Sequence, residues 1–143
     1  MSRWDPGLSE PDRHAVAVAM DPQRFAVPDY IRALADPSWR VRKAALRHVR
    51  HYSSDPAFVD SLVLSLSSEE NAGLRNAASE ALVQLGAAAV SSLANSLAEG
   101  SVDVRKFVVE ALGLIGGDGA ERALYTALED TDLNVRAAAA EAL

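Results

Sequence analysis

The chain of 143 residues contains no cysteine. This absence excludes disulfide bonds, thiolate catalysis and cysteine-ligated zinc or iron–sulfur sites, and it fits a reducing cytoplasm best. No uninterrupted apolar run approaches the roughly 18 residues that a membrane helix needs, and the first seven residues do not resemble a signal peptide. From these absences we expect a cytoplasmic protein without a membrane partner.

Aromatic residues make up only 6% of the chain, so a core must be built mostly from Ala, Leu and Val. What the sequence does have is 49% apolar and 24% charged residues, a balance typical of a folded globular protein. The length suits one ordinary domain. The net charge of −6 disfavours binding of nucleic acid or an anionic membrane by the chain as a whole.

Four segments of the chain align with one another without gaps. Each segment has an arginine, an acid six residues before it and a good helix N-cap four residues before it. Three features that recur four times in register indicate an internal repeat. The arginines are Arg42, Arg75, Arg105 and Arg136, the acids are Asp36, Glu69, Glu99 and Asp130, and the caps are Ser38, Asn71, Ser101 and Asp132.

Each repeat is predicted to form two helices and no strand. Second helices stop at Gly86 and Gly116, where a left-handed cap is sterically free, while Asp55 and Asp118 are expected to cap first helices. Apolar residues at helical spacing predict the core. In first helices these are Tyr30, Ile31, Leu34, Val63, Leu64, Leu66, Leu93, Leu97, Leu124, Tyr125 and Leu128; in second helices they are Val41, Ala45, Val49, Tyr52, Leu74, Ala78, Leu82, Leu85, Val104, Val108, Leu112, Ile115 and Val135.

The run from Glu99 through Arg105 to Gly116, with its acid, cap, Val-Arg pair and Ala/Leu-rich helix, resembles HEAT repeats. The spacings of 33, 30 and 31 residues between the arginines are similar to the short HEAT-like repeats of phycobilisome-lyase proteins. Pro28 lies where HEAT repeats often place a proline that kinks the first helix. The resemblance covers residues 25–143 and implies an all-α fold, a right-handed α–α superhelix of four helix pairs with an N-terminal capping segment.

We therefore predict an N-terminal arm and cap helix at residues 1–24, followed by repeats at 25–53, 54–86, 87–117 and 118–143. Residues 1–8 are expected to form a loose arm, Ser9 to Met20 a short helix, and Asp21 and Pro22 the start of the next helix. The last repeat is incomplete, because Leu143 falls at the position of Leu82 and Leu112. We therefore expect either a fragment of a longer array or an open end that pairs with another copy.

Candidate chemistry is sparse. The HEAT resemblance implies a structural role for the acid–arginine pairs (Asp36/Arg42, Glu69/Arg75, Glu99/Arg105 and Asp130/Arg136), which link one repeat to the next. His48 and His51 have the spacing to share a metal but lack a third ligand, and no nucleophile–base pair can be assembled. The glycine-rich stretch 113–119 follows a helix and lacks a Gly-Lys-Ser/Thr ending, which indicates a turn and not a phosphate loop. We expect no catalytic residue, metal or cofactor.

Charge is unevenly distributed: residues 1–53 carry nine Arg or Lys and six Asp or Glu (net +3), whereas residues 54–143 carry five and fourteen (net −9). Because second helices line the concave side of HEAT solenoids, the resemblance implies a groove that is basic at its N-terminal end and acidic beyond it. The partner-binding residues expected there are Arg40, Lys43, Arg47, Arg50, His51, Asn76, Glu80, Gln84, Asp103, Lys106 and Glu110, with Trp39 exposed beside the basic part.

These observations predict a non-catalytic scaffold that binds another protein through charge complementarity. Two alternatives stay open. The resemblance permits a bilin lyase or isomerase subunit, or a chromophore chaperone, which would deliver an open-chain tetrapyrrole to a cysteine on another protein. It also permits a nucleic-acid-binding HEAT-like protein, although most of the expected groove is acidic.

Overall fold

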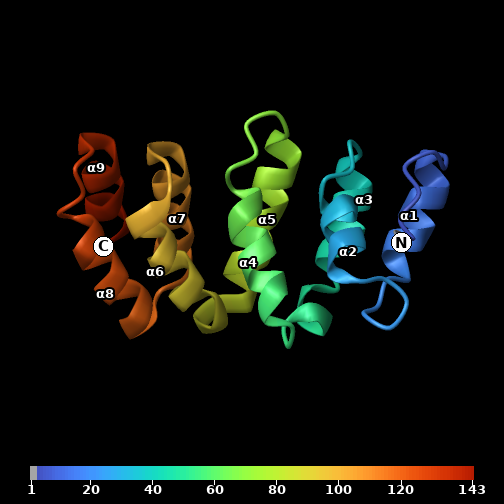
Figure 1. The fold of residues 1–143 in the computed structure, drawn as a ribbon, viewed down its shortest axis with the longest axis horizontal. Helices are drawn as coiled ribbons and strands as arrows, with labels where there is room; N and C mark the ends of the chain where they lie inside the picture. The colour runs from blue at the N-terminus through green and yellow to red at the C-terminus, as the bar shows by residue number, and fades with distance from the viewer. Residues whose placement is uncertain (1–2) are drawn as a thin grey trace. The chain divides into compact units, whose positions relative to one another are not determined.

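The computed structural model describes residues 3–143, and every regular element in that range is a helix (Figure 1). The prediction of an all-α fold without strands is therefore confirmed for these residues. The α-helices are α1 (Glu10–Val18), α2 (Val27–Leu34), α3 (Trp39–Leu46), α4 (Pro56–Ser65), α5 (Ala72–Leu85), α6 (Val90–Glu99), α7 (Val102–Ile115), α8 (Gly117–Ala127) and α9 (Leu133–Ala142), with the 3-10 turns η1 (Val49–Tyr52) and η2 (Gly86–Ala89). The chain forms two compact units, one that reaches to Ala81 and one at Leu82–Leu143.

In the first unit α3 packs against α1 and α2, and α2 also contacts α4. Three aromatic side chains, Tyr30, Tyr52 and Phe58, form the centre of its core, with the Tyr30 and Tyr52 rings stacked at a centroid distance of 4.3 Å. The Tyr30 hydroxyl donates to the Ala45 carbonyl at 2.6 Å, and the Tyr52 hydroxyl donates to the Phe25 carbonyl at 2.8 Å. Burial raises the pKa of Tyr30 well above its ordinary value, and burial together with the charges of Asp21 and Asp29 raises the pKa of Tyr52 to about 12. Both tyrosine hydroxyls are therefore neutral and act as hydrogen-bond donors.

In the second unit α7 contacts α6, α8 and α9, and α8 also contacts α6 and α9. Small residues allow the close approach of α7 and α9: a Cβ added at Gly113 would lie 2.8 Å from the Ala142 Cβ. Leu93 on α6, Leu112 on α7 and Leu124 on α8 are buried in the core of this unit, with at most 3% of their surface exposed. The core is thus made of aliphatic side chains, as the low aromatic content predicts.

The predicted helix ends agree with the structure at most positions. Side chains of Asp55, Asn71, Ser101 and Asp132 accept backbone N–H groups of the helices that they precede. Gly86 and Gly116 have φ angles of +62° and +68°, so both predicted left-handed glycines are confirmed. Ser38 occupies the N-cap position of α3 as predicted, but its hydroxyl donates to Glu10 and accepts no helix N–H. The cap predicted at Asp118 was wrong, because Asp118 lies inside α8, which follows Gly116.

The N-terminal arm is not loose from residue 3 onward; residues 1–2 lie outside the described residues. The Asp29 carboxylate accepts the backbone N–H of Arg3 at 2.8 Å and of Trp4 at 3.0 Å, and the Trp4 side chain is buried. The predicted helix start at Asp21 is instead a short turn that the Asp21 side chain stabilises by accepting two backbone N–H groups. Pro28 does not kink a helix, because it lies in the first turn of α2, where its missing N–H costs nothing.

Two predicted core residues are exposed: 72% of Leu64 and 56% of Tyr125 are accessible to solvent. In α4 the buried face consists of Phe58, Val59 and Leu62, which continue onto Leu66 just after the helix. Leu64 is two residues from Leu62 and therefore points away from that face, since two residues turn a helix by about 200°. The prediction of an apolar helix here was correct, but the predicted rotation of that helix about its axis, and with it the buried face, was wrong.

The continuous helical stretch Ala72–Glu99 corrects the expectation about membrane segments. It contains an 18-residue window of mean hydropathy 1.4, of which only 22% is buried, and is long and apolar enough to cross a membrane by length and composition. The stretch includes the left-handed residue Gly86 and the 3-10 turn η2 between α5 and α6. Neither α-helix alone reaches the roughly 20 residues of a straight membrane span.

Candidate interaction surface

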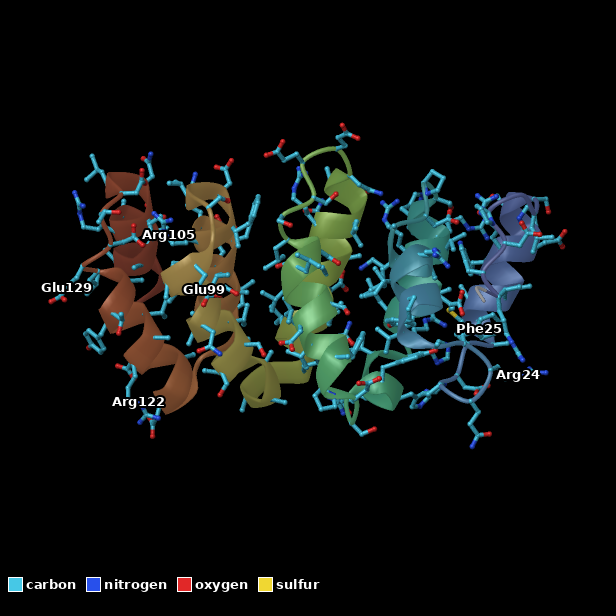
Figure 2. All side chains as sticks on the ribbon, in the orientation of Figure 1. Arg24, Phe25, Glu99, Arg105, Arg122 and Glu129 are labelled. Atoms are coloured by element: carbon cyan, nitrogen blue, oxygen red, sulfur yellow. The ribbon has the colours of Figure 1, made fainter. Side chains whose placement is uncertain are left out.

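An arginine fork links the two helix pairs of the second unit. Arg105 on α7, labelled in Figure 2, donates to both carboxylate oxygens of Asp130 in the α8–α9 loop, at 2.9 and 3.1 Å, and to the Gly100 carbonyl at 2.8 Å. Asp130 also accepts the backbone N–H of Asp132 at 2.9 Å, and its own carbonyl accepts a bond from Arg136 at 2.8 Å. This single carboxylate therefore fixes both the neighbouring repeat and the start of α9.

The pKa of Asp130 reflects two opposing effects. Burial by itself raises the pKa of this carboxyl, but the hydrogen bonds from Arg105 and the Asp132 N–H, together with the charges of Arg105 and Arg136, outweigh it. The net result is a pKa below the ordinary value of an aspartate. The folded protein therefore stabilises the ionised form.

The first unit contains the same arrangement. Arg13 on α1 donates to the two carboxylate oxygens of Asp36 at 2.7 and 3.3 Å, and Asp36 accepts the backbone N–H of Ser38 at 2.9 Å. Arg42 donates to the carbonyl of Asp36 at 2.7 Å. Sequence reasoning missed Arg13, although Ser9 stands four residues before it, as the cap does in each repeat, and accepts the Asp12 N–H.

These contacts differ from the pairs expected within each repeat. Where a fork forms, the arginine's carboxylate partner is the acid of the following repeat. The acid six residues before the arginine supplies a backbone carbonyl to Arg42, Arg75 and Arg136, whereas Arg105 binds the carbonyl of Gly100. The two glutamates in the acid series, Glu69 and Glu99, are exposed (Glu99 is labelled in Figure 2). Arg75 donates to the carbonyls of Ser68 and Glu69. An aspartate side chain is short enough to accept the N–H two residues on, which holds it in place for the fork.

A cleft of about 240 Å³ lies between α1 and α3, and we call it the basic cleft. It is lined by His14, Val18, Trp39, Arg40, Lys43, Ala44 and Arg47. The Lys43 ammonium forms an ion pair with Glu80 at 3.1 Å, whereas Arg40 and Arg47 form none with any residue that the structure describes. The Trp39 side chain is 65% exposed, as the sequence predicted. Two guanidinium groups and an indole are therefore available to a ligand.

The structure does not bring all predicted basic residues together. Arg50 and His51 lie in η1, outside the basic cleft. The His48 Nε2 atom lies 2.8 Å from the Val18 carbonyl oxygen, which requires that nitrogen to carry the proton. Within residues 3–143 no group of three or more His, Asp or Glu side chains is placed to hold a metal ion. His14 on α1, which was not predicted as a binding residue, joins the cleft because α1 packs on α3.

The remaining predicted residues are divided between two helices. Asn76, Glu80 and Gln84 lie on α5 and are exposed, and Glu80 is the ion-pair partner of Lys43. Asp103, Lys106 and Glu110 lie on α7. Glu110 borders a cleft of about 510 Å³ between α7 and α9, which we call the acidic groove; its lining residues are Glu110, Gly113, Leu114, Ala138, Glu141 and Ala142.

Comparison with known proteins identifies only the C-terminal part of the chain. No curated protein matches it. Residues 90–143, which contain α6 to α9, match the family model described as HEAT repeats. The phycobilisome-lyase subtype stays a prediction. The match, together with the all-helical structure, supports a HEAT-like repeat family for these helices.

Proposed function

We propose that this chain is a non-catalytic scaffold that binds another protein along a concave groove, basic at its N-terminal end and acidic beyond it. HEAT repeats generally mediate protein–protein interaction, which fits this role for the matched helices. The single observation that carries the proposal is the basic cleft, where two arginines that form no ion pair within residues 3–143 lie beside an exposed tryptophan. Such a cluster is typical of the residues that dominate binding energy in protein interfaces.

The chemistry of the basic cleft selects an acidic segment with an apolar side chain. Arg40 and Arg47 are separated by seven residues, or about 10 Å along an α-helix, so they can contact two carboxylates on one segment. In the same cleft Trp39 and Val18, which are 65% and 50% exposed, offer apolar surface for one side chain. Lys43 contributes less to a ligand because Glu80 already neutralises it.

The test is binding of a fluorescein-labelled peptide of alternating Asp and Leu, measured by fluorescence anisotropy at low salt. We expect Arg47→Glu to weaken binding about tenfold, equivalent to about 1.4 kcal/mol. Trp39→Ala should cost about 2 kcal/mol, since it removes the apolar anchor. Circular dichroism at 222 nm should show unchanged helicity in both variants.

Arg50→Glu is the matched control, because it changes the net charge equally but lies outside the basic cleft. The dissociation constant of this variant for the peptide should stay within about twofold of the wild-type value, because salt screens the effect of a remote surface charge. If Arg47→Glu and Arg50→Glu lost the same affinity for the peptide, net charge alone and not the basic cleft would account for binding. A peptide with Lys in place of Asp should not bind.

A further inference from the structure

We propose that the residues lining the acidic groove between α7 and α9 bind the residues lining the basic cleft of a second copy of this chain. This inference rests on the proposed function, because it names an acidic partner for the same cleft. Each chain carries both halves of the contact, so association requires no other protein.

The acidic groove combines an apolar centre with an anionic rim. Glu110 and Leu114 lie one turn apart on α7, and 73% of Leu114 is exposed. Ala138 and Ala142 of α9 add apolar surface, and Glu141 lies on the α9 side. Neither Glu110 nor Glu141 forms an ion pair with a described residue.

The basic cleft has the complementary composition. Its two unpaired cations, Arg40 and Arg47, match the two unpaired carboxylates of the groove in number and sign. Its apolar residues, Trp39 and Val18, are 65% and 50% exposed. Contact between the two surfaces would bury the tryptophan and Leu114 at the centre and place opposite charges around them, which is the usual arrangement in protein interfaces.

The two clefts also occupy equivalent places in the repeat. Each lies between two consecutive arginine-bearing helices: Arg13 and Arg42 belong to the helices of the basic cleft, and Arg105 and Arg136 to those of the acidic groove. The helical framework is therefore similar in both, and the charges differ. The wider sequence follows the same division, with a net charge of +3 over residues 1–53 and −9 over residues 54–143. Copies therefore attract one another through unlike regions.

Sedimentation velocity on the full chain, up to about 100 μM at low salt, tests the proposal in a range that detects micromolar association. The wild type should associate with increasing concentration, and added salt should reverse this. Arg40→Glu/Arg47→Glu and Glu110→Arg/Glu141→Arg should each be monomeric alone, because each variant places like charges opposite one another. An equimolar mixture of the two variants should associate again, because both contacts are then of opposite sign.

Two control pairs reverse the same number of charges outside both surfaces. Arg24→Glu/Arg50→Glu and Glu99→Arg/Glu129→Arg should associate like the wild type (Arg24, Glu99 and Glu129 are labelled in Figure 2). Tryptophan emission gives a second readout: Trp39 should shift to the blue on association, while Trp4, only 6% exposed, should not change.

A wild type that stays monomeric over the whole range, or a mixture of the two variants that fails to associate, would overturn this inference. A different result would contradict the proposed function: an Arg47→Glu variant that binds the acidic peptide as tightly as the wild type does. A monomeric wild type that still binds the peptide would leave the basic cleft as a docking site for a different acidic protein and remove the second copy as its partner.

Discussion

Replacement of Phe58 by alanine should lower the free energy of unfolding by about 3–5 kcal/mol. The Phe58 side chain is completely buried, and its ring centroid lies 5.5 Å from that of Tyr30 and 5.6 Å from that of Tyr52. Truncation removes the transfer free energy of the ring and leaves a cavity beside the stacked Tyr30 and Tyr52 rings, which their hydrogen bonds hold in place. Urea denaturation followed by circular dichroism at 222 nm measures the loss.

Leu64→Ala is the matched control on the same helix, because Leu64 is 72% exposed. It should change the free energy of unfolding by no more than about 0.5 kcal/mol. Tyr30→Phe should cost only about 1 kcal/mol, since it removes one hydrogen bond and keeps the ring. The Ala45 carbonyl also accepts the His48 N–H and is not left without a donor. A Phe58→Ala loss as small as that of Leu64→Ala would contradict the placement of the aromatic core.

Asp130→Ala is expected to destabilise the protein by about 2–3 kcal/mol at neutral pH. The substitution removes the carboxylate that accepts two bonds from Arg105 and one from the Asp132 N–H. It leaves the Arg105 side chain, which is only 16% exposed, without its carboxylate partner. Denaturation of Glu129→Ala, an exposed neighbour, provides the control and should match the wild type within about 0.5 kcal/mol. The same measurement on Asp130→Asn separates charge from hydrogen bonding, because the amide keeps an acceptor oxygen.

The contribution of the Asp130 charge should also depend on pH. Its pKa is lower in the folded protein than in the unfolded chain, so the stabilisation is complete above the unfolded pKa of about 4. It is lost as the pH falls through the folded value, because protonation then removes the negative charge that Arg105 binds. The difference in stability between wild type and Asp130→Asn should therefore shrink on acidification below about pH 4. A difference that stayed constant down to pH 2 would show that the charge contributes nothing.

Much of the local structure could be predicted from the sequence because it depends on neighbouring residues. The N-caps at Asn71, Ser101 and Asp132 act through backbone N–H groups two or three residues away. Gly86 and Gly116 stop helices because a residue without a Cβ adopts a positive φ without strain. These helix ends therefore followed from local sequence, whereas the helix start expected at Asp21 and the cap expected at Asp118 did not.

The candidate site was predictable only in part. The spacing of Arg40, Lys43 and Arg47 places them on one face of α3, and all three line the basic cleft; that they bind a partner stays a prediction. The contribution of His14 and Val18 depends on how α1 packs against α3, which no local spacing in either helix encodes. Arg50 was assigned to the same face because a longer helix was expected, but the chain changes to a 3-10 turn after His48.

The sequence by itself determined the helical fold, most of the helix caps and the arginine series, because hydrogen bonds and steric limits within a few residues fix those features. Only the tertiary structure decided which carboxylate each arginine fork binds, as with Arg13 and Asp36, 23 residues apart, or Arg105 and Asp130, 25 residues apart. It also decided that Leu64 is exposed while Trp4 is buried over Asp29. The physical reason is the same in each case: the rotation of a helix about its axis, and the partner of a long side chain, depend on surfaces supplied by distant parts of the chain.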